Sequence, residues 1–413
     1  MLCTRPARGE NDVSMKLAHH RHLAYCTNIH RGESWPEILA SLERHTLAVR
    51  ERVAPGRPYA IGLRLGDLAA RELGEPATLA AFQRWLDRHD CYVFTINGFP
   101  FGRFHGAAVK EQVYAPDWTT QERLDYTRRL FDLLAQLVPS DIAGSVSTVP
   151  GSFKEFIHTD DQARAMRRNL WLCVEHIAAL SERTGRKLHL GLEPEPLCYL
   201  ETSDEVVRFF DRLRDDRPTD HRIEFHLGVN YDACHLAIEF EEPAVALNRL
   251  RENGILLSKI HLSSALKLHP TPAARAALAA FADATYLHQV VARLADGRLQ
   301  WFRDLSEALA RTSFLDARTS PLVVHPSSEW RVHFHIPLHA APTPVFGTTT
   351  DHLLGVLDYV AAHPDACAHF EMETYTWEVL PPELRAGHVV DQLAAEYAWT
   401  LARFAERGIT VTG

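Results

Sequence analysis

Two glutamates follow a short apolar run in the segment Leu188-His-Leu-Gly-Leu-Glu-Pro-Glu-Pro196. The run has the length and composition of a strand that is buried on both faces. Pro194 and Pro196 have no backbone N–H and cannot continue a central strand, so we expect the strand to end here. Glu193 and Glu195 therefore lie at the carboxyl end of a predicted strand, where α/β proteins carry catalytic and binding groups. Taken alone, such acids could equally cap the next helix.

Three further apolar runs end on side chains of the same kind: Asp232 with His235, then His261, then Glu371 with Glu373. Adjacent parallel strands lie about 4.8 Å apart, so the tips of four consecutive strands can surround one small cavity. Buried carboxylates without partners are very costly, and a bound cation removes that cost. We therefore predict a metal site at these strand ends. The candidate ligands at these ends include Glu193, Asp232, His261 and Glu373.

Carboxylate oxygens and an imidazole nitrogen form a borderline-hard ligand set. Such a set suits a divalent metal ion (Mn²⁺, Zn²⁺, Co²⁺, Fe²⁺ or Mg²⁺) better than copper or an iron–sulfur cluster. Each residue also has an ordinary structural use, His261 as a buried hydrogen-bonding histidine, Asp232 as a helix N-cap and Glu373 as a surface acid. The metal prediction depends on the four residues occurring together, at corresponding positions of successive strands.

A second concentration of histidines occurs in Trp330-Arg-Val-His-Phe-His-Ile-Pro-Leu-His339. His333 and His335 are two residues apart and share a face where the chain is extended. Asp232 and His235 are three apart, a spacing at which a first helical turn brings both side chains to one site. Histidines at this density favour a role near the site, although the chain has 24 histidines in total.

The chain must place these groups with a regular alternation of strands and helices. Eight strand–helix units predict an α/β fold, the (β/α)₈ TIM barrel. A doubly wound open sheet is the alternative, and no G-x-G-x-x-G follows the first strand, which argues against a dinucleotide fold. The predicted strands lie near 22–30, 59–65, 91–97, 142–149, 188–192, 223–230, 255–262 and 367–373.

One barrel domain is expected over residues 16–413, preceded by a disordered arm at 1–15. The section 266–330 is too long for an ordinary connection, so we predict a subdomain inserted after strand seven on the active-site face. Its aromatic residues could line the pocket, although packing within the insertion is the commoner use of each one. These aromatic candidates are Tyr286, Trp301 and Phe302.

The composition is that of an ordinary globular protein, with 46% hydrophobic and 23% charged residues among 413. A net charge of −9 argues against duplex nucleic acid as a partner. The 7 cysteines include no C-x-x-C pair, which favours a reduced, cytoplasmic protein. No run of transmembrane length and no signal-peptide core occurs, so no direct membrane segment is expected.

The order of these motifs resembles the xylose-isomerase-like TIM-barrel superfamily, which includes tagatose-type sugar epimerases and the apurinic endonuclease IV family. A closer resemblance, over roughly residues 16–410, is to the metabolite traffic protein EboE family. It is carried by Tyr25-Cys-Thr-Asn-Ile-His30, Gly32-Glu-Ser-Trp35, Leu192-Glu-Pro-Glu-Pro196, Val229-Asn-Tyr-Asp-Ala-Cys-His235 and Glu371-Met-Glu-Thr-Tyr-Thr-Trp-Glu-Val-Leu-Pro381.

The superfamily resemblance implies the same four metal ligands, with Glu193 and Glu373 also moving protons as the catalytic pair. His235 matches a substrate-contacting histidine, or a ligand of a further metal in the endonuclease group. His333 and His335 resemble that group's ligand pair after strand seven. We assign His333 to metal binding, and His235, Glu195 and His335 to substrate binding.

The second and third strands depart from the endonuclease pattern. They carry Arg64 and Asn97 near their ends, in place of the histidines that a trinuclear zinc site needs. The EboE resemblance implies a small polyhydroxylated, sugar- or cyclitol-like metabolite, with other proteins of the same gene cluster as partners.

Three functions are compatible with these features. The leading one is a metal-dependent isomerase or epimerase of a small polyhydroxylated substrate. The second is metal-assisted phosphoester hydrolysis, which needs two or three metals about 3.5–4 Å apart. The third is a non-catalytic carrier that holds a metabolite in the barrel. Fold analogy does not choose among them.

Overall fold

The structure is a computed structural model that describes residues 16–104, 110–282, 285–313, 329–380, 385 and 387–412. The arm predicted at 1–15 lies outside the described residues. Eight parallel strands form a ring, and the short antiparallel β1 (Lys16–Leu17) pairs with the first of them. The ring closes through a parallel bridge between Cys26 and Gly62. The barrel strands are β2 (Arg21–Tyr25), β3 (Tyr59–Arg64), β4 (Cys91–Asn97), β5 (Gly144–Thr148), β6 (Leu188–Leu192), β7 (Leu227–Asp232), β8 (Leu256–Leu262) and β14 (His369–Met372).

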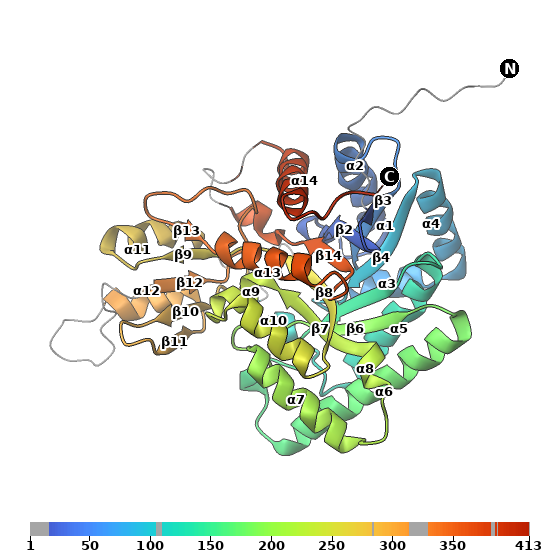
Figure 1. Cartoon of the computed structure of the whole chain (residues 1–413), viewed down its shortest axis with the longest axis horizontal. Coiled ribbons are helices and arrows are strands. Elements are labelled where there is room, and N and C mark those ends of the chain that lie inside the picture. Colours follow the sequence, from blue (N-terminus) through green and yellow to red (C-terminus); the bar gives the residue numbers. More distant parts are fainter. Residues whose placement is uncertain are drawn as a thin grey trace.

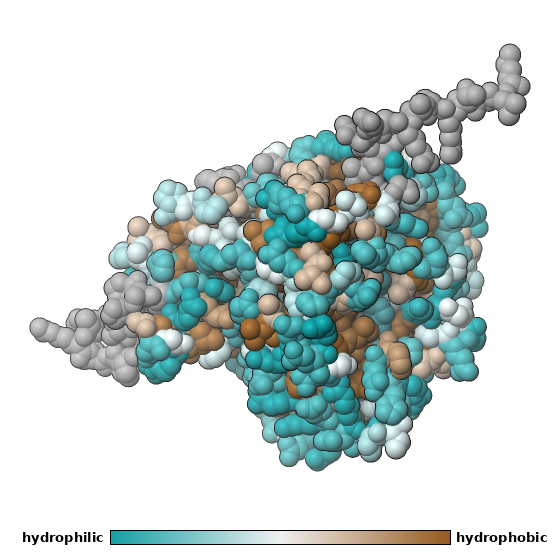
Figure 2. All heavy atoms as spheres, viewed as in Figure 1, coloured by the Kyte–Doolittle hydropathy of each residue, from teal (hydrophilic) through white to brown (hydrophobic). Residues whose placement is uncertain are grey.

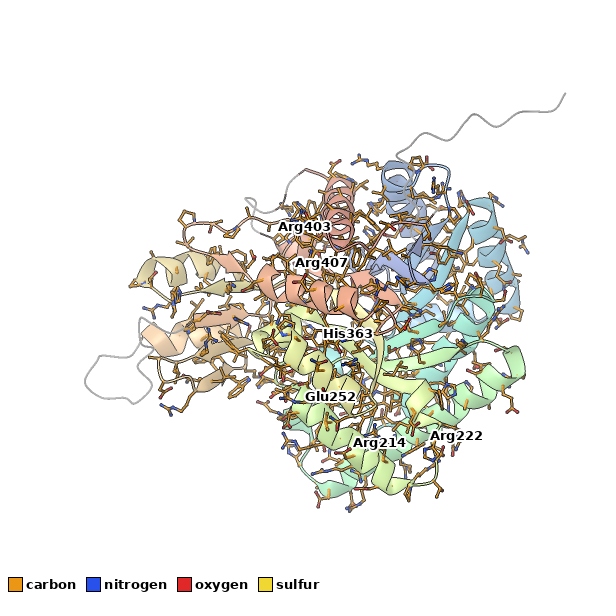
Figure 3. The ribbon with its side chains drawn as sticks, viewed as in Figure 1. Arg214, Arg222, Glu252, His363, Arg403 and Arg407 are labelled. Carbon is orange, nitrogen blue, oxygen red and sulfur yellow. The ribbon has the colours of Figure 1, made fainter. Side chains whose placement is uncertain are left out.

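Helices cover the outside of the ring, so the predicted TIM barrel is confirmed (Figure 1). Their apolar faces pack on the strands, and in the view of Figure 2 their outer faces are mostly hydrophilic. Figure 3 shows charged residues on these faces, and Arg407, in the turn after the last helix, forms an ion pair with Asp358 at 2.7 Å. The helices that follow the strands are α1 (Trp35–Ser41), α2 (Leu47–Val53), α3 (Asp67–Leu73), α4 (Pro76–Arg88), α5 (Gln121–Leu137), α6 (Asp160–Thr184), α7 (Ser203–Asp216), α9 (Ala233–Ile238), α10 (Pro243–Glu252), α13 (Thr350–Ala362) and α14 (Val389–Ala405).

Local sequence explains where these helices begin and end. Ser34 and Glu37 form the capping box expected at the start of α1. Helix α6 begins at a second capping box and ends at Gly185, whose φ of 69° is left-handed and suits glycine. Helix α7 buries its apolar residues at helical spacing, which fixes its inner face against the barrel. These residues are Val206, Phe209, Phe210 and Leu213.

A second, antiparallel sheet lies beside the barrel, at the left of Figure 1. It is built from the chain between β8 and α13, so the inserted sheet continues past Trp330 to Thr348. Helices α11 (Pro272–Leu278) and α12 (Leu305–Ser313) accompany it, and Phe281, Trp330 and Phe334 form part of its own apolar core. Its strands are β9 (Leu266–Leu268), β10 (Val290–Arg293), β11 (Leu299–Phe302), β12 (Glu329–Val332) and β13 (Gly347–Thr348).

The sixth barrel strand begins later than the sequence pattern predicted. Residues Ile223–His226 form a short helix, α8, and β7 begins only at Leu227. The alternation of apolar and polar residues suggested a strand, yet Phe225 is 67% exposed and only Ile223 of this turn is buried. The later start places Asp232 within the strand, as its last residue. Among the described residues, no helix combines the length and apolar character needed to cross a membrane.

Candidate metal centre

Four neighbouring strands of the barrel bring the predicted metal ligands together. Strands β6, β7, β8 and β14 are adjacent in the ring. Asp232 lies directly beside His261 in the strand register, while Glu193 and Glu373 each follow the last residue of their strand. All four side chains are buried, and one ligand atom from each lies within 4.8 Å of the others. We call Glu193, Asp232, His261 and Glu373 the carboxylate set.

The three acids of the carboxylate set surround one nitrogen of its histidine. His261 Nδ1 lies 3.0 Å from Glu193 Oε1, 3.0 Å from Glu373 Oε2 and 3.5 Å from Asp232 Oδ2. One N–H cannot satisfy three carboxylates, and Glu193 Oε2 and Asp232 Oδ2 are buried with no hydrogen-bond partner. Three acids and one imidazole in this arrangement fit a divalent cation, which would neutralise the charges and take up the unpaired oxygens.

Asp232 serves both as a helix cap and as a potential metal ligand. Its Oδ1 accepts hydrogen bonds from the backbone N–H of His235 at 2.9 Å and from Ser263 Oγ at 2.8 Å, which caps α9. Its Oδ2 faces the carboxylate set. Glu373 is held in a similar way, because Oε1 accepts from the side-chain amides of Asn28 at 2.7 Å and Asn97 at 3.3 Å.

The electrostatics of His261 reflect this concentration of negative charge. Burial alone would lower the pKa of His261, but Glu373 and Glu193 raise it well above its usual value. Burial likewise opposes ionisation of Glu193, yet His261 holds the pKa of this acid below its usual value. A proton on His261 therefore stabilises the acids when no other cation is present, and a metal ion would replace that proton.

A second buried group consists of His235, His333 and His335, which we call the histidine trio. His235 Nε2 lies 3.1 Å from His333 Nε2 and 3.4 Å from His335 Nε2. The other ring nitrogens face acceptors, because His235 Nδ1 donates to Pro194 O at 3.0 Å and His335 Nδ1 donates to Glu373 O at 2.8 Å. His333 Nδ1 donates to Gln289 Oε1 at 2.7 Å.

These acceptors assign the tautomers of the trio. Each ring carries a proton on Nδ1, so the Nε2 lone pairs of all three rings converge. Such an arrangement needs an added proton or a cation between the rings. Burial opposes a proton on His235, but Asp232 and Glu195 raise its pKa, while burial and the neighbouring His235 keep the pKa of His333 well below its usual value.

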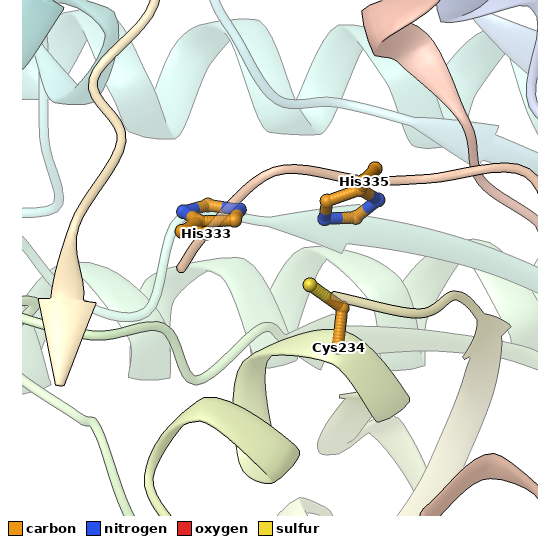
Figure 4. Close-up of side chains that lie close together, drawn as sticks. All are labelled: Cys234, His333 and His335. Carbon is orange, nitrogen blue, oxygen red and sulfur yellow. The ribbon is translucent and has the colours of Figure 1, made fainter. Parts of the chain in front are cut away.

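Further ligand-type side chains border the histidine trio. Glu195 with His235 and His333, and Cys234 with His333 and His335, each offer ligand atoms within 4.8 Å of one another. Figure 4 shows the Cys234 thiol directed from α9 toward the two imidazole rings. Burial raises the pKa of Cys234 well above its usual value and that of Glu195 to about 7. Because the chain turns at Pro194, Glu193 lies in the carboxylate set whereas Glu195 lies beside the histidine trio.

A small cavity of about 50 Å³ opens onto both groups, and Glu193, Glu195, His235, His333 and Glu373 line it. Three aromatic rings from different segments, Phe104, Tyr286 and Tyr375, also line it, and their centroids lie 5.2 to 5.4 Å apart. Since Tyr286 comes from the insertion, the inserted section contributes to this cavity. A larger cavity of about 670 Å³ is lined by other residues, among them His30, His45 and Trp377, and none of the carboxylate set lines it.

The other candidates from the sequence lie away from the cavity wall. His335 is fully buried with its ring 4.8 Å from that of Tyr375, and it is absent from the described residues that line the cavity. Trp301 donates its indole N–H to Glu239 on the barrel side, and Phe302 packs in the core of the insertion.

Several residues that organise the site carried no clear sequence signal. Tyr114 and Gln289 both donate to Glu195 Oε1, although they come from a 3₁₀ helix (Lys110–Tyr114) and from the insertion. Lys259 forms a buried ion pair with Glu371 beneath His261. Only Lys259 could have been found, because it lies two residues before His261 and shares its strand face.

The sequence matches no protein-family model and no curated protein sequence. Solved structures do share its architecture. A xylose isomerase-like TIM barrel protein from Mycobacterium smegmatis, solved in complex with magnesium, is 12% identical, with a TM-score of 0.51 over 94% of this chain and 98% of that chain.

Two further structures are similar at a lower TM-score. An L-ribulose 3-epimerase is 11% identical, with a TM-score of 0.49 over 94% of this chain and 95% of that chain. A xylose isomerase domain protein from Planctomyces limnophilus is 13% identical, with a TM-score of 0.48 over 88% and 92% of the two chains. Likeness at this identity shows a TIM-barrel fold alone, and the function has to be argued from the site.

Proposed function

We propose that the carboxylate set binds one divalent cation, and that the protein is a metal-dependent isomerase or epimerase of a small sugar- or cyclitol-type metabolite. The observation that carries the proposal is the convergence of three buried carboxylates on His261 Nδ1 at 3.0 to 3.5 Å, with two oxygens unpaired. A structure of similar fold, the Mycobacterium smegmatis protein, was solved in complex with magnesium, which supports a divalent ion in a barrel of this kind.

Glu193 and Glu373 are the proposed proton-transfer groups. A bound cation would supply Lewis acidity toward neighbouring hydroxyl and carbonyl oxygens of a substrate. Glu193 lines the cavity with its Oε2 unpaired, so it can remove a proton from a carbon next to a carbonyl. Glu373 is held through Oε1 by Asn28 and Asn97, while its Oε2 lies 3.0 Å from His261 Nδ1 and would return a proton from another direction. Glu195 and His235 line the same cavity and would contact the substrate.

Solvent-deuterium exchange tests this chemistry directly. Protein loaded with Mn²⁺ or Mg²⁺ is incubated in D₂O with a panel of ketoses and oxidised cyclitols, and deuterium at the carbon beside the carbonyl is followed by NMR. We expect exchange with at least one panel member, and its loss in Glu373→Gln with metal retained. Glu239→Gln removes a buried acid outside the site and is the matched control. Tight binding of a panel member without exchange in the wild type would replace the enzyme with a metabolite carrier.

A second candidate function is metal-dependent phosphoester hydrolysis, and the histidine trio is the observation that favours it. Three imidazole lone pairs beside the carboxylate set could hold a second cation, and hydrolytic two-metal sites use a pair of ions about 3.5–4 Å apart. A metal count on the purified protein separates the possibilities, since one ion favours isomerisation, two favour hydrolysis and none favours a carrier.

The resemblance to the EboE family supports a narrower version of the proposal. In that version the substrate is a sugar- or cyclitol-like intermediate that proteins of the same gene cluster supply and consume. Exchange experiments with the purified neighbouring gene products present and absent would test it. An unchanged rate with each of them would argue for an enzyme that acts alone.

A further inference from the structure

Beneath the carboxylate set, the barrel contains a buried ion pair that touches only one of its members. Lys259 Nζ lies 2.6 Å from Glu371 Oε2, and the same oxygen lies 2.8 Å from His261 Nε2. The side chains of Lys259, His261 and Glu371 are all 0% exposed. His261 therefore uses its two nitrogens differently, with Nδ1 facing the carboxylate set and Nε2 facing Glu371.

The surroundings hold Glu371 in this position. Glu371 lies directly beside His261 in the register of β14 and β8. A Cβ atom at Gly62 would come within 2.0 Å of Glu371 Oε1, so the strand β3 backbone leaves room for the carboxylate only because residue 62 is glycine. Lys259 is anchored in turn, because its Nζ also donates to Ser147 Oγ at 3.0 Å.

This arrangement decides which nitrogen of His261 is available to a metal. An acceptor oxygen at Nε2 requires a proton there, which leaves Nδ1 to carry the lone pair toward Glu193, Asp232 and Glu373. Lys259 adds a positive charge that offsets the charge of Glu371 next to three further acids. An apolar barrel interior could fill the same space, but without an acceptor oxygen it would hold neither the ring nor its tautomer.

We propose that Lys259 and Glu371 form a positioning pair, which fixes His261 with its proton on Nε2 and so sets the affinity of the carboxylate set for its cation. The pair touches neither the cation nor the substrate. The inference rests on the proposed metal site, and it adds that the barrel interior below the site determines how strongly the metal is held.

A double-mutant cycle tests the pair. Lys259→Met leaves Glu371 without its counter-charge, and Glu371→Gln leaves Lys259 without a counter-charge beside an amide. We expect each single variant to weaken Mn²⁺ and Zn²⁺ binding by about 10- to 100-fold in calorimetric titrations, as is typical for groups that orient a metal-bound histidine. The double variant carries no charge at positions 259 and 371, and its glutamine oxygen can still accept from His261 Nε2. We expect it to bind metal more tightly than either single variant.

A readout from the metal-free protein separates this inference from the metal site itself. In ¹⁵N-histidine-labelled wild type we expect a slowly exchanging Nε2–H proton of His261, which disappears in Glu371→Ala. If this proton is present but the wild type binds no divalent metal, the metal site fails and the positioning pair stands. If the metal binds and neither single variant changes its affinity or the Nε2–H signal, the pair is only a structural ion pair and the inference is wrong.

Variants that fail to fold do not block the test. Ser147→Ala removes one anchor of Lys259 without burying an unpaired charge. We expect a loss of metal affinity of about threefold to tenfold in this variant, because Lys259 keeps its charge and Glu371 but loses one hydrogen bond that holds it in place. Metal affinity equal to that of the wild type in Ser147→Ala, with Lys259→Met and Glu371→Gln unfolded, would overturn the proposal.

Discussion

The carboxylate set and the histidine trio are neighbours, yet they are built from different parts of the chain. Their buried polar groups also differ in what they need from a partner. Barrel strands carry the carboxylate set, whose three acids meet at one imidazole nitrogen. The trio combines His235 of α9 with two residues of the connection after β12, and backbone or amide oxygens orient its rings. The first group has an excess of negative charge, whereas the second has an excess of lone pairs.

Because of this difference, two adjacent groups can depend on a bound metal to different degrees. Buried carboxylates in excess are stabilised by a divalent cation or by several protons. Neutral imidazoles need only one proton or one cation among them, so the trio can persist without metal. We therefore expect the carboxylate set to bind its ion more tightly, and the trio to prefer a nitrogen-seeking ion such as Zn²⁺.

The largest expected effect is loss of metal from the carboxylate set. Glu193→Gln and Asp232→Asn each remove a charge from an oxygen-rich site, so we expect at least about 100-fold weaker Mn²⁺ binding with the fold retained. Elemental analysis and circular dichroism measure the two properties. The control is Glu239→Gln, which keeps the set intact. Full metal content in both site variants would contradict the assignment of the ligands.

The next largest effect is the loss of a second metal ion from the trio. Its absence would contradict the view that the trio is a separate metal site. His235→Asn removes the central ring, so we expect loss of a second Zn²⁺ equivalent while the first remains bound. Titration followed by native mass spectrometry gives the stoichiometry. A wild-type protein that binds one equivalent even at excess Zn²⁺ would make the trio a hydrogen-bonded cluster, and phosphoester hydrolysis would lose its support.

The barrel and the carboxylate set were accessible from sequence because both depend on short-range periodicity. Side chains alternate along a strand, so acids at strand ends meet once the strands are parallel. The pattern failed at Ile223, where a helical turn imitates a strand. It also did not predict which way the Glu195 side chain points. The chain turns at Pro194, so this carboxylate accepts hydrogen bonds from Tyr114 and Gln289.

Contacts within the insertion could not be predicted from the sequence pattern, for a different reason. Gln289 and His333 meet at the edge of the second sheet, where β10 pairs with β12. Antiparallel register between distant segments depends on turns and packing that no local repeat encodes. The density of histidines near His333 indicated a site, but not that His335 would be buried behind Tyr375.

A smaller effect is the pH dependence of metal binding by the carboxylate set. Burial lowers the pKa of His261, but Glu373 and Glu193 raise it well above 6.5. The metal must displace the Nδ1 proton, so we expect apparent affinity to rise with pH through the neutral range and to level off above this pKa. The slope is at most about tenfold per pH unit for one proton. Isothermal titration in buffers of different ionisation enthalpy counts the protons released. Release of none would show that His261 is already neutral.

The smallest expected effect is on the pH dependence of stability and concerns Glu239, a buried acid outside the carboxylate set. Glu239 is 3% exposed and accepts the indole N–H of Trp301, and burial raises its pKa to about 8. The unfolded carboxyl ionises near 4.5, while the folded one keeps its proton up to about pH 8. Its contribution to the free energy of unfolding is therefore fully present below pH 4.5 and is lost as pH rises toward 8.

Glutamine at position 239 does not titrate, so Glu239→Gln should gain stability relative to the wild type as pH rises. We expect the relative gain to be on the order of 2 kcal/mol between pH 5 and pH 8, measured by urea unfolding of metal-loaded protein. Metal content should not change in this variant. A gain that is equal at both pH values would mean that Glu239 is ionised in the folded protein. Burial by itself would then not distinguish acids that hold a proton from acids that hold a cation.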